Sequence, residues 1–405
     1  MTKKPSYRFA GYTEPWERRK LGEISSRVKG NDGRMDLPTL TISAGQGWLD
    51  QRERFSGNIA GKEQKNYTLL RIGELSYNHG NSKLAKYGVV FQLNNYTEAL
   101  VPKVYHSFKM IDGRSGTFFE YLFATKIPDR ELGKLVSSGA RMDGLLNITY
   151  DDFMSIKLTF PKNNEEQTAI GSFFQDIDQL ISLQQRKLEV LKEQKKTYLK
   201  LLFPTKGQTK PALRFAGFED DWKEVKLGEI LVERNEQISE SEEYQLMSFV
   251  QGKGVVPKSD RYDRSFLVKD DKKNYKKTEY GDFIYSSNNL DTGSIGFNKT
   301  GKALISPVYS IFYSKTKKES QFIAILSQRK EFINEMIKYR QGVVYGQFRI
   351  HESDFLNIKI LAPESNEQEF LITFFQDLDK AIAKQEEKVN QLKESKQTLL
   401  RKMFI

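Results

Sequence analysis

The sequence predicts an α+β fold in which two β-rich globular domains and two long helices form a pseudo-twofold internal repeat. "RFAGYTEPWERRKLGEI" (8–24) returns as "RFAGFEDDWKEVKLGEI" (214–230), with 10 of 17 positions identical. Further along each half, 167–203 matches 368–404 at 16 of 37 positions. Two similar segments in the same order in both halves indicate one module written twice.

The two later segments have the pattern of amphipathic helices. Apolar residues recur at steps of three and four, which places them on one face of a helix. A helix of about 37 residues is roughly 55 Å long, more than a small domain can cover. We therefore expect the helices to pack on each other as an antiparallel coiled coil, although packing on their own domains is the alternative. The predicted interface residues are Phe173, Ile177, Leu188, Leu191, Phe374, Leu378, Val389 and Leu392.

Polar residues interrupt both apolar stripes at matching positions. Gln184 and Lys195 interrupt the first, and Gln385 and Lys396 the second. Polar residues at such positions usually specify register and partner. Each helical run also contains a near-identical hexapeptide, "FFQDID" (173–178) and "FFQDLD" (374–379). We expect its acidic residues to lie near the first turn, where negative charge suits the helix dipole.

The segments between these anchors contain short β-branched and aromatic runs separated by Gly, Asn and Asp, as strands and turns do. They share a faint skeleton but little sequence, so we expect one fold with different loops. The predicted organisation is a first globular domain (1–160), a first helix with its linker (161–207), a second globular domain (208–362) and a second helix (363–405).

Charge is unevenly distributed along the 405 residues, whose formal net charge is +11. The helical runs are neutral, whereas 25–149 and 231–350 each carry an excess of five positive charges. A basic globular block is a candidate phosphate-binding surface. Rigid helices between two such blocks predict contacts with two separated patches of one duplex, about 10 bp apart if both blocks read the same face.

Catalytic and membrane functions are not indicated. The chain has no cysteine and three scattered histidines, so we expect no metal site. No nucleophile, zinc-protease or base-orienting methyltransferase motif is present, and an apparent P-loop at 296–303 has Ala303 where a hydroxyl is required. No apolar run is long enough to span a membrane and no secretory signal is visible. We expect a cytoplasmic protein that is not itself an enzyme.

The arrangement resembles the specificity subunit of a type I restriction-modification system. The resemblance covers essentially the whole chain and is carried by "WERRKLGEI" and "WKEVKLGEI", the "P-x-x-N-E-Q" approaches (the first has one extra residue), and the two hexapeptides. It implies a non-catalytic adaptor in which two target-recognition domains read the halves of a bipartite DNA site. Two methylation subunits and restriction subunits would then be its partners, and S-adenosylmethionine, ATP and magnesium would bind to them.

Candidate DNA-reading residues lie in three pairs of polar loops that the two middle segments place at matching positions. The first loop is 43–48 against 248–254, in which Gln46 matches Gln251; the second is 77–87 against 286–294, and the third is 137–144 against 339–347. Gln46 and Gln251 have the amide chemistry that reads adenine, and lysines in and near the loops suit phosphates. Different loops in the two halves predict an asymmetric site; an ordinary solvated turn is the alternative for each loop. The candidates are Ser43, Gln46, Asn78, Asn81, Ser82, Lys83, Lys86, Arg141, Ser248, Gln251, Lys253, Lys272, Lys273, Asn288, Asn289, Tyr345 and Gln347.

Two other functions remain open at this stage. A stand-alone DNA-binding regulator would bind its site tightly without partner subunits. A pure scaffold protein would bind DNA weakly or without salt dependence, because its basic charge would be incidental.

Overall fold

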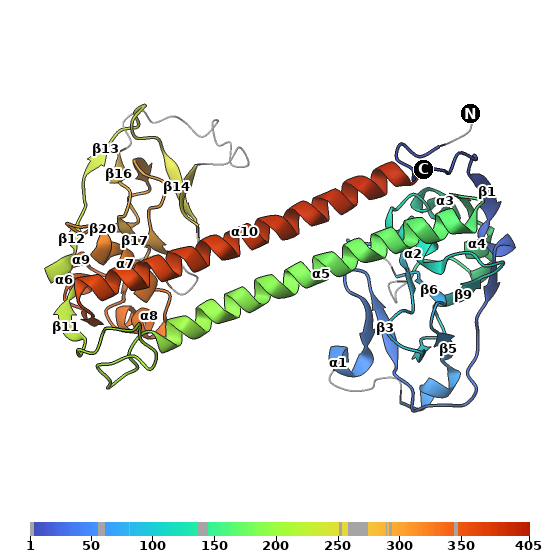
Figure 1. Cartoon of the computed structure of the whole chain (residues 1–405), viewed down its shortest axis with the longest axis horizontal. Helices are drawn as coiled ribbons and strands as arrows, with labels where there is room; N and C mark the ends of the chain where they lie inside the picture. The colour runs from blue at the N-terminus through green and yellow to red at the C-terminus, as the bar shows by residue number, and fades with distance from the viewer. Residues whose placement is uncertain are drawn as a thin grey trace. The chain divides into compact units, whose positions relative to one another are not determined.

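A computed structural model describes residues 4–55, 61–80, 82–136, 145–250, 253–257, 274–288, 290, 294–343 and 347–405. The chain forms two compact units, which we call unit 1 (1–185 with 387–405) and unit 2 (186–386). Each unit contains one globular block and a piece of both long helices, α5 (Asn164–Leu201) and α10 (Ser365–Met403), drawn green and red in Figure 1.

Unit 1 is built on small antiparallel sheets. The largest has the strand order β2-β9-β6-β7, beside the pairs β1-β10, β3-β4 and β5-β8. Its strands are β1 (Glu17–Lys20), β2 (Ser25–Arg27), β3 (Leu40–Ser43), β4 (Gly47–Asp50), β5 (Thr68–Arg71), β6 (Leu75–Asn78), β7 (Val89–Gln92), β8 (Glu98–Val101), β9 (His106–Met110) and β10 (Lys157–Phe160). Its shorter helices are α1 (Gln51–Phe55), α2 (Gly116–Ala124), α3 (Asp129–Leu135) and α4 (Tyr150–Ser155), with 3-10 turns at Leu21–Glu23 and Gly61–Asn66.

Unit 2 repeats this topology. Its four-stranded sheet has the order β12-β20-β17-β18, beside β11-β23, β14-β15 and β13-β16-β19, and it adds the hairpin β21-β22. Its strands are β11 (Lys223–Lys226), β12 (Val232–Glu233), β13 (Gln237–Ile238), β14 (Met247–Val250), β15 (Gly254–Pro257), β16 (Tyr275–Thr278), β17 (Phe283–Tyr285), β18 (Ile295–Phe297), β19 (Ala303–Ile305), β20 (Ser310–Tyr313), β21 (Gln341–Val343), β22 (Gln347–Arg349) and β23 (Lys359–Ala362). Its helices are α6 (Leu227–Ile230), α7 (Lys318–Leu326), α8 (Lys330–Ile337) and α9 (Glu352–Leu356).

The end of a long helix completes the hydrophobic core of each unit. In unit 1 the core includes Leu400, Met403 and Phe404 from the end of α10, and in unit 2 it includes Leu202 and Phe203 from the end of α5. The helix that follows one globular block therefore ends in the core of the unit that contains the other block. The prediction of one α+β fold written twice, with two long helices, is confirmed.

The repeated motifs fasten each long helix to its own globular block. Arg8 donates two hydrogen bonds of 2.7 Å to the carboxylate of Glu166, and Arg214 donates two of 2.8 and 2.7 Å to that of Glu367. Both carboxylates are buried. Such paired, planar bonds suit the fixed geometry of a guanidinium group. Each half of the chain thus has a structural clamp, formed by the arginine of "RFAG" and a glutamate in the first turns of the long helix.

Antiparallel pairing of α5 and α10 is visible within each unit. In unit 1, the ammonium of Lys396 lies 2.6 Å from a carboxylate oxygen of Asp178. In unit 2, the ammonium of Lys195 lies 2.6 Å from a carboxylate oxygen of Asp379. The two ion pairs occupy equivalent positions of the repeat, so each polar lysine of the stripe meets the last aspartate of a hexapeptide.

The role expected for the hexapeptide aspartates is wrong. Helix α5 begins at Asn164, so Asp178 lies several turns beyond the end where the dipole acts, and Glu165 and Glu166 occupy the first turn. The phenol of Tyr121 also donates a 2.7 Å hydrogen bond to Asp178. The last aspartate of the repeated hexapeptide therefore makes contacts between helices and does not lie at a helix end.

Exchanging the charges of the unit 1 pair tests whether it helps to set the helix register. We expect Asp178→Lys to destabilise unit 1 because two lysines then face each other, and Asp178→Lys with Lys396→Asp to restore most of the loss. The coupling energy should be about 1 kcal/mol, since both side chains are partly exposed. Urea unfolding of the four proteins of a double-mutant cycle measures it. A coupling energy near zero contradicts the assignment.

The predicted coiled-coil residues differ in burial. Leu188 and Val389, at equivalent positions of the repeat, are buried. Phe173 and Ile177 pack against the core of unit 1, and Phe374 packs against that of unit 2. The remaining three, Leu191, Leu378 and Leu392, are half-buried. Their role in a coiled-coil interface stays a prediction.

Candidate nucleic-acid interface

The first pair of predicted loops forms the tips of two equivalent hairpins. In β3–β4, Ser43 pairs with Gly47 across the turn, and in β14–β15, Val250 pairs with Gly254. Both closing glycines have positive φ, 73° and 81°, which a residue with a Cβ adopts only with strain. Three residues separate the paired positions in each turn, so the two hairpin turns have the same length.

The hairpin register corrects the matching of Gln46 with Gln251. The backbone N–H of Gln46 donates to the carbonyl of Ser43, and that of Lys253 donates to the carbonyl of Val250. Gln46 therefore corresponds to Lys253, and both side chains are exposed at the tips. Ser248 lies within the β14 ladder, opposite Val256, rather than at the tip. Gln251 lies outside the described residues.

The second predicted loop of unit 1 lies beside the first hairpin. The side-chain amide of Asn78 donates to the carbonyl of Ile42, while its oxygen accepts a hydrogen bond of 3.1 Å from the N–H of Gly80. A Cβ built at Gly45, in the hairpin turn, would lie 3.3 Å from the side chain of Leu84 in the second loop. Asn78 therefore holds the two loops together, which occupies the amide expected to contact a base.

The end of the third loop of unit 1 joins the same place. Gly80 forms an antiparallel bridge with Leu145, the first described residue after this loop. The ring of His79 lies 2.8 Å through Nδ1 from the carbonyl oxygen of Leu146 and 3.0 Å through Nε2 from that of Val104. The hairpin, the second loop and the end of the third loop therefore converge at one edge of unit 1.

Equivalent loops converge in unit 2. The side-chain oxygen of Asn288 in the second loop accepts a hydrogen bond of 2.5 Å from the N–H of Phe348 in β22, and Ser287 accepts one of 3.0 Å from Ile350. On the other side, a Cβ at Gly254 would lie 2.7 Å from the carbonyl oxygen of Phe297 in β18. Asn288, like Asn78, supports neighbouring loops through its side chain.

The predicted phosphate contacts that the structure describes have exposed side chains. Lys83 and Lys86 lie in the second loop of unit 1, and Lys253 lies at the hairpin tip of unit 2. Ser82, also in the second loop, accepts a hydrogen bond from the N–H of Ala85 and thereby shapes the turn. The candidates outside the described residues are Asn81, Arg141, Gln251, Lys272, Lys273, Asn289 and Tyr345, and the side chain of Gln347 is also outside them.

Sequence reasoning missed an exposed apolar pair at this edge. Val104 is 50% exposed and Val308, its counterpart in the repeated "PVY"-like segment, is 65% exposed. Leu84, 71% exposed, lies beside the hairpin of unit 1. Exposed apolar side chains are the groups that contact the thymine methyl group in protein–DNA interfaces. The shared segment at 99–108 and 303–312 was the available signal, but exposure within it cannot be deduced from one sequence.

Two stacked histidines lie under the loops of unit 1. The rings of His79 and His106 are 4.8 Å apart and nearly parallel, and Nε2 of His106 lies 2.9 Å from the carbonyl oxygen of Ile148. Burial lowers the pKa of His106 to about 4. The ring is therefore neutral at pH 7 and serves packing.

This pKa makes the stability of unit 1 depend on pH. Between about pH 6.5 and 4 the unfolded chain takes up a proton that the folded chain resists, so stability should fall by up to roughly 3 kcal/mol as pH drops. We expect His106→Ser to flatten this dependence, because serine has no group that titrates in this range. Serine is chosen because Ser310 holds the equivalent register position in unit 2. Urea midpoints measured across this range test it. An equal pH slope in the variant and the unaltered protein refutes it.

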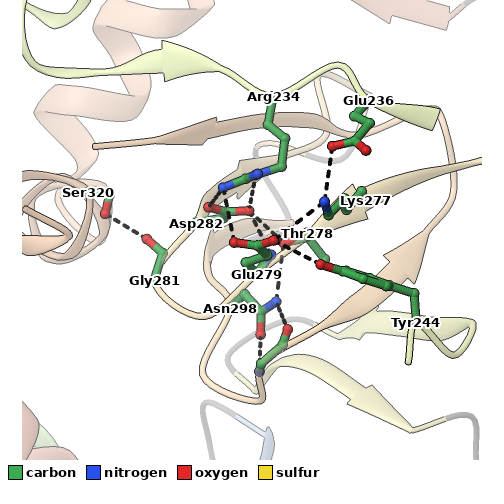
Figure 2. A network of polar contacts seen from close by, with 11 residues as sticks. Arg234, Glu236, Tyr244, Lys277, Thr278, Glu279, Gly281, Asp282, Asn298 and Ser320 are labelled. Atoms are coloured by element: carbon green, nitrogen blue, oxygen red, sulfur yellow. Dashed lines mark hydrogen bonds and ion pairs between the residues drawn. The ribbon is translucent and has the colours of Figure 1, made fainter. Parts of the chain in front are cut away.

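A network of polar side chains in unit 2 makes contacts that are structural (Figure 2). Arg234 makes an ion pair of 2.7 Å with the buried carboxylate of Asp282, which also accepts from the hydroxyl of Thr278 and the N–H of Glu279. Asn298 donates to Thr278 and to the carbonyl of Gly301. The network closes the turn that leads into β17.

Unit 1 has apolar residues at three of the corresponding positions, whereas Glu74 corresponds to Asp282. Val28, Leu70 and Leu93 belong to a hydrophobic cluster there. Matching backbone hydrogen bonds and strand pairs establish the correspondence. Their counterparts in unit 2 are, in the same order, Arg234, Thr278 and Asn298. At these three positions, one scaffold therefore accepts either apolar side chains or hydrogen-bonded polar side chains.

Within the described part of the chain, no group of three or more His, Asp or Glu side chains is arranged to hold a metal ion. Among the helices in the same residues, none combines the length and apolar character needed to cross a membrane.

Comparisons with known proteins agree with the resemblance. Residues 219–394 match the family model described as Type I restriction modification DNA specificity domain. The Type I restriction enzyme MjaVIII specificity subunit of Methanocaldococcus jannaschii is 25% identical over 285 residues, which cover 65% of this chain and 65% of that protein. The match thus spans slightly less than two thirds of that relative.

Two solved structures share the fold. A type I restriction-modification system S subunit from M. genitalium matches with a TM-score of 0.62 and 15% identity, covering 100% of this chain and 99% of the other. A chain from a study of complex assembly and conformational transition of the type I R-M system matches with a TM-score of 0.51 and 16% identity, covering 97% and 99%.

The duplicated α+β units bring equivalent loops together in both halves of the chain. The second half carries a type I DNA specificity domain. The family match over 219–394, the sequence similarity to the M. jannaschii subunit and the shared fold agree with the resemblance to type I restriction-modification specificity subunits.

Proposed function

We propose that this chain reads an asymmetric, bipartite DNA sequence, with each unit contacting one half. The observation that carries the proposal is the convergence of equivalent loops in both units, on one scaffold but with different residues at the tips. Gln46 stands where Lys253 stands in the second hairpin. An amide suits adenine, whereas an ammonium suits guanine or a phosphate. Different side chains on one scaffold are what reading two different half-sites requires.

The chain acts without catalysis of its own in this proposal. Two methylation subunits and restriction subunits assemble with it, and S-adenosylmethionine, ATP and magnesium bind to those partners. The curated relative is itself named a specificity subunit, and a solved neighbour comes from work on assembly of such a system.

Exchange of one recognition block tests the proposal. Residues 25–149 should be replaced by the corresponding block of another specificity subunit, leaving Arg8 and Glu166 to fasten it. We expect only one half of the methylated motif to change, because the other half is read by unit 2. The matched control exchanges 231–350, after which only the other half should change. A change in both halves from either exchange contradicts independent reading.

A further inference from the structure

A groove in unit 2 runs from the reading loops to the long helices. It has a volume of about 960 Å³. Lys253 at the hairpin tip and Leu290 in the second loop line one part of it. Residues of α7, α8 and α10 line the rest. We call it the lysine groove, after Lys195, Lys253, Lys299 and Lys330, which line it.

The lysine groove carries an excess of positive charge. Its two acidic side chains, Asp379 and Glu386, are already bound to lysines: Asp379 lies 2.6 Å from Lys195, and Glu386 lies 2.5 Å from Lys192. Lys299 approaches Asp379 only to 4.0 Å and is 47% exposed. Lys253 and Lys330 are exposed. Three ammonium groups therefore face solvent around one depression beside the reading loops.

The corresponding positions of unit 1 lack these lysines. Gln46 stands at the hairpin tip in place of Lys253. Asn94 follows the residue equivalent to Asn298 and so replaces Lys299. The first residue of α3 is Asp129, whereas the first residue of α8 is Lys330. The scaffold does not need the three charges, because it folds in unit 1 without them.

We propose that the lysine groove binds the DNA phosphate backbone beside the half-site read by unit 2, and that unit 1 has no equivalent contact. This inference rests on the proposed function. Clustered ammonium groups next to base-reading loops provide the electrostatic and positioning part of DNA binding. The asymmetry confines this groove contact to the second half-site. An acidic segment of a partner protein is the other ligand that such a groove would attract, and the experiment separates the two.

The test compares two triple variants in the complex with methylation subunits. Lys253→Gln, Lys299→Gln and Lys330→Gln remove the groove charges. Lys206→Gln, Lys223→Gln and Lys226→Gln remove three exposed charges of unit 2 outside the groove. Each phosphate contact contributes about 0.9 to the slope of log K against log salt concentration. We expect the magnitude of this slope to fall by about 2 to 3 in the groove variant and by less than about 1 in the control variant.

Equal slopes in the groove and control variants overturn the inference while leaving sequence reading intact. Loss of methylation-subunit binding with an unchanged salt slope also overturns it, since the groove would then bind protein. If the unaltered complex binds its mapped site no better than unrelated DNA, the proposed function fails. The groove inference is still decided in that case by the salt slopes on unrelated DNA, so the two failures are distinguishable.

Discussion

Replacing Glu367 with alanine is expected to lower the free energy of unfolding of unit 2 by about 3–5 kcal/mol. The carboxylate is 2% exposed and accepts both bonds of the Arg214 guanidinium, which is itself 13% exposed. Without its partner, this positive charge remains buried and uncompensated. A guanidinium group keeps its proton in proteins, so Arg214 cannot relieve the burial of its charge by losing the proton. Urea unfolding, monitored by hydrogen exchange of amides in unit 2, measures the loss of free energy of unfolding.

Glu224→Ala provides the matched control. Glu224 forms a 2.7 Å ion pair with Lys359 in the same unit, but both side chains are more than half exposed. Surface pairs of this kind contribute about 0–1 kcal/mol. If Glu367→Ala costs no more than Glu224→Ala, the clamp does not fasten α10 to its block. Glu166→Ala should produce the same loss in unit 1, because Glu166 holds Arg8 in the same geometry.

Replacing Phe404 with alanine is expected to destabilise unit 1 by about 3–5 kcal/mol, since it removes a large side chain from a packed core. Phe404 is 3% exposed, and its ring lies 5.3 Å from that of Phe118 and 5.9 Å from that of Phe174. Although Phe404 follows the second globular block in sequence, it packs in unit 1. Hydrogen exchange should therefore accelerate in unit 1 rather than in unit 2.

Two further variants make this prediction specific. Phe203→Ala should produce the opposite pattern, because Phe203 is fully buried in the core of unit 2, beside Trp222 and Phe322. Leu183→Ala, on a 64% exposed position of α5, should change stability by less than about 0.5 kcal/mol. Faster exchange in unit 2 after Phe404→Ala would contradict the assignment of the helix ends.

Repetition made the fold predictable from one sequence. The duplicated segments at 8–24 and 214–230, with the two long amphipathic runs, indicated twin units and paired helices. The partners of the repeated residues were not predictable. Arg8 and Glu166 are far apart in the chain, and the aspartates of the hexapeptides had a plausible local role at a helix end. Only packing in three dimensions shows which side chains meet.

The reading residues were harder to predict than the scaffold. Loop sequences diverge between the units, so matching Gln46 with Gln251 followed residue identity, whereas the ladder of each hairpin matches Gln46 with Lys253. Asn78 and Asn288 had the right chemistry for base contacts but bond to neighbouring backbone. A polar loop residue has the same appearance in a sequence whether it supports a loop or reads DNA.

The most direct measurement is a genome-wide map of modified adenines after this chain is co-expressed with the methylation subunits of its system. We predict one bipartite motif with two different half-sequences separated by unspecified bases. The Gln46→Lys variant should change the half read by unit 1 and leave the other half unchanged. A continuous motif, a symmetric motif or no motif would contradict the central claim that each unit reads its own half of an asymmetric site.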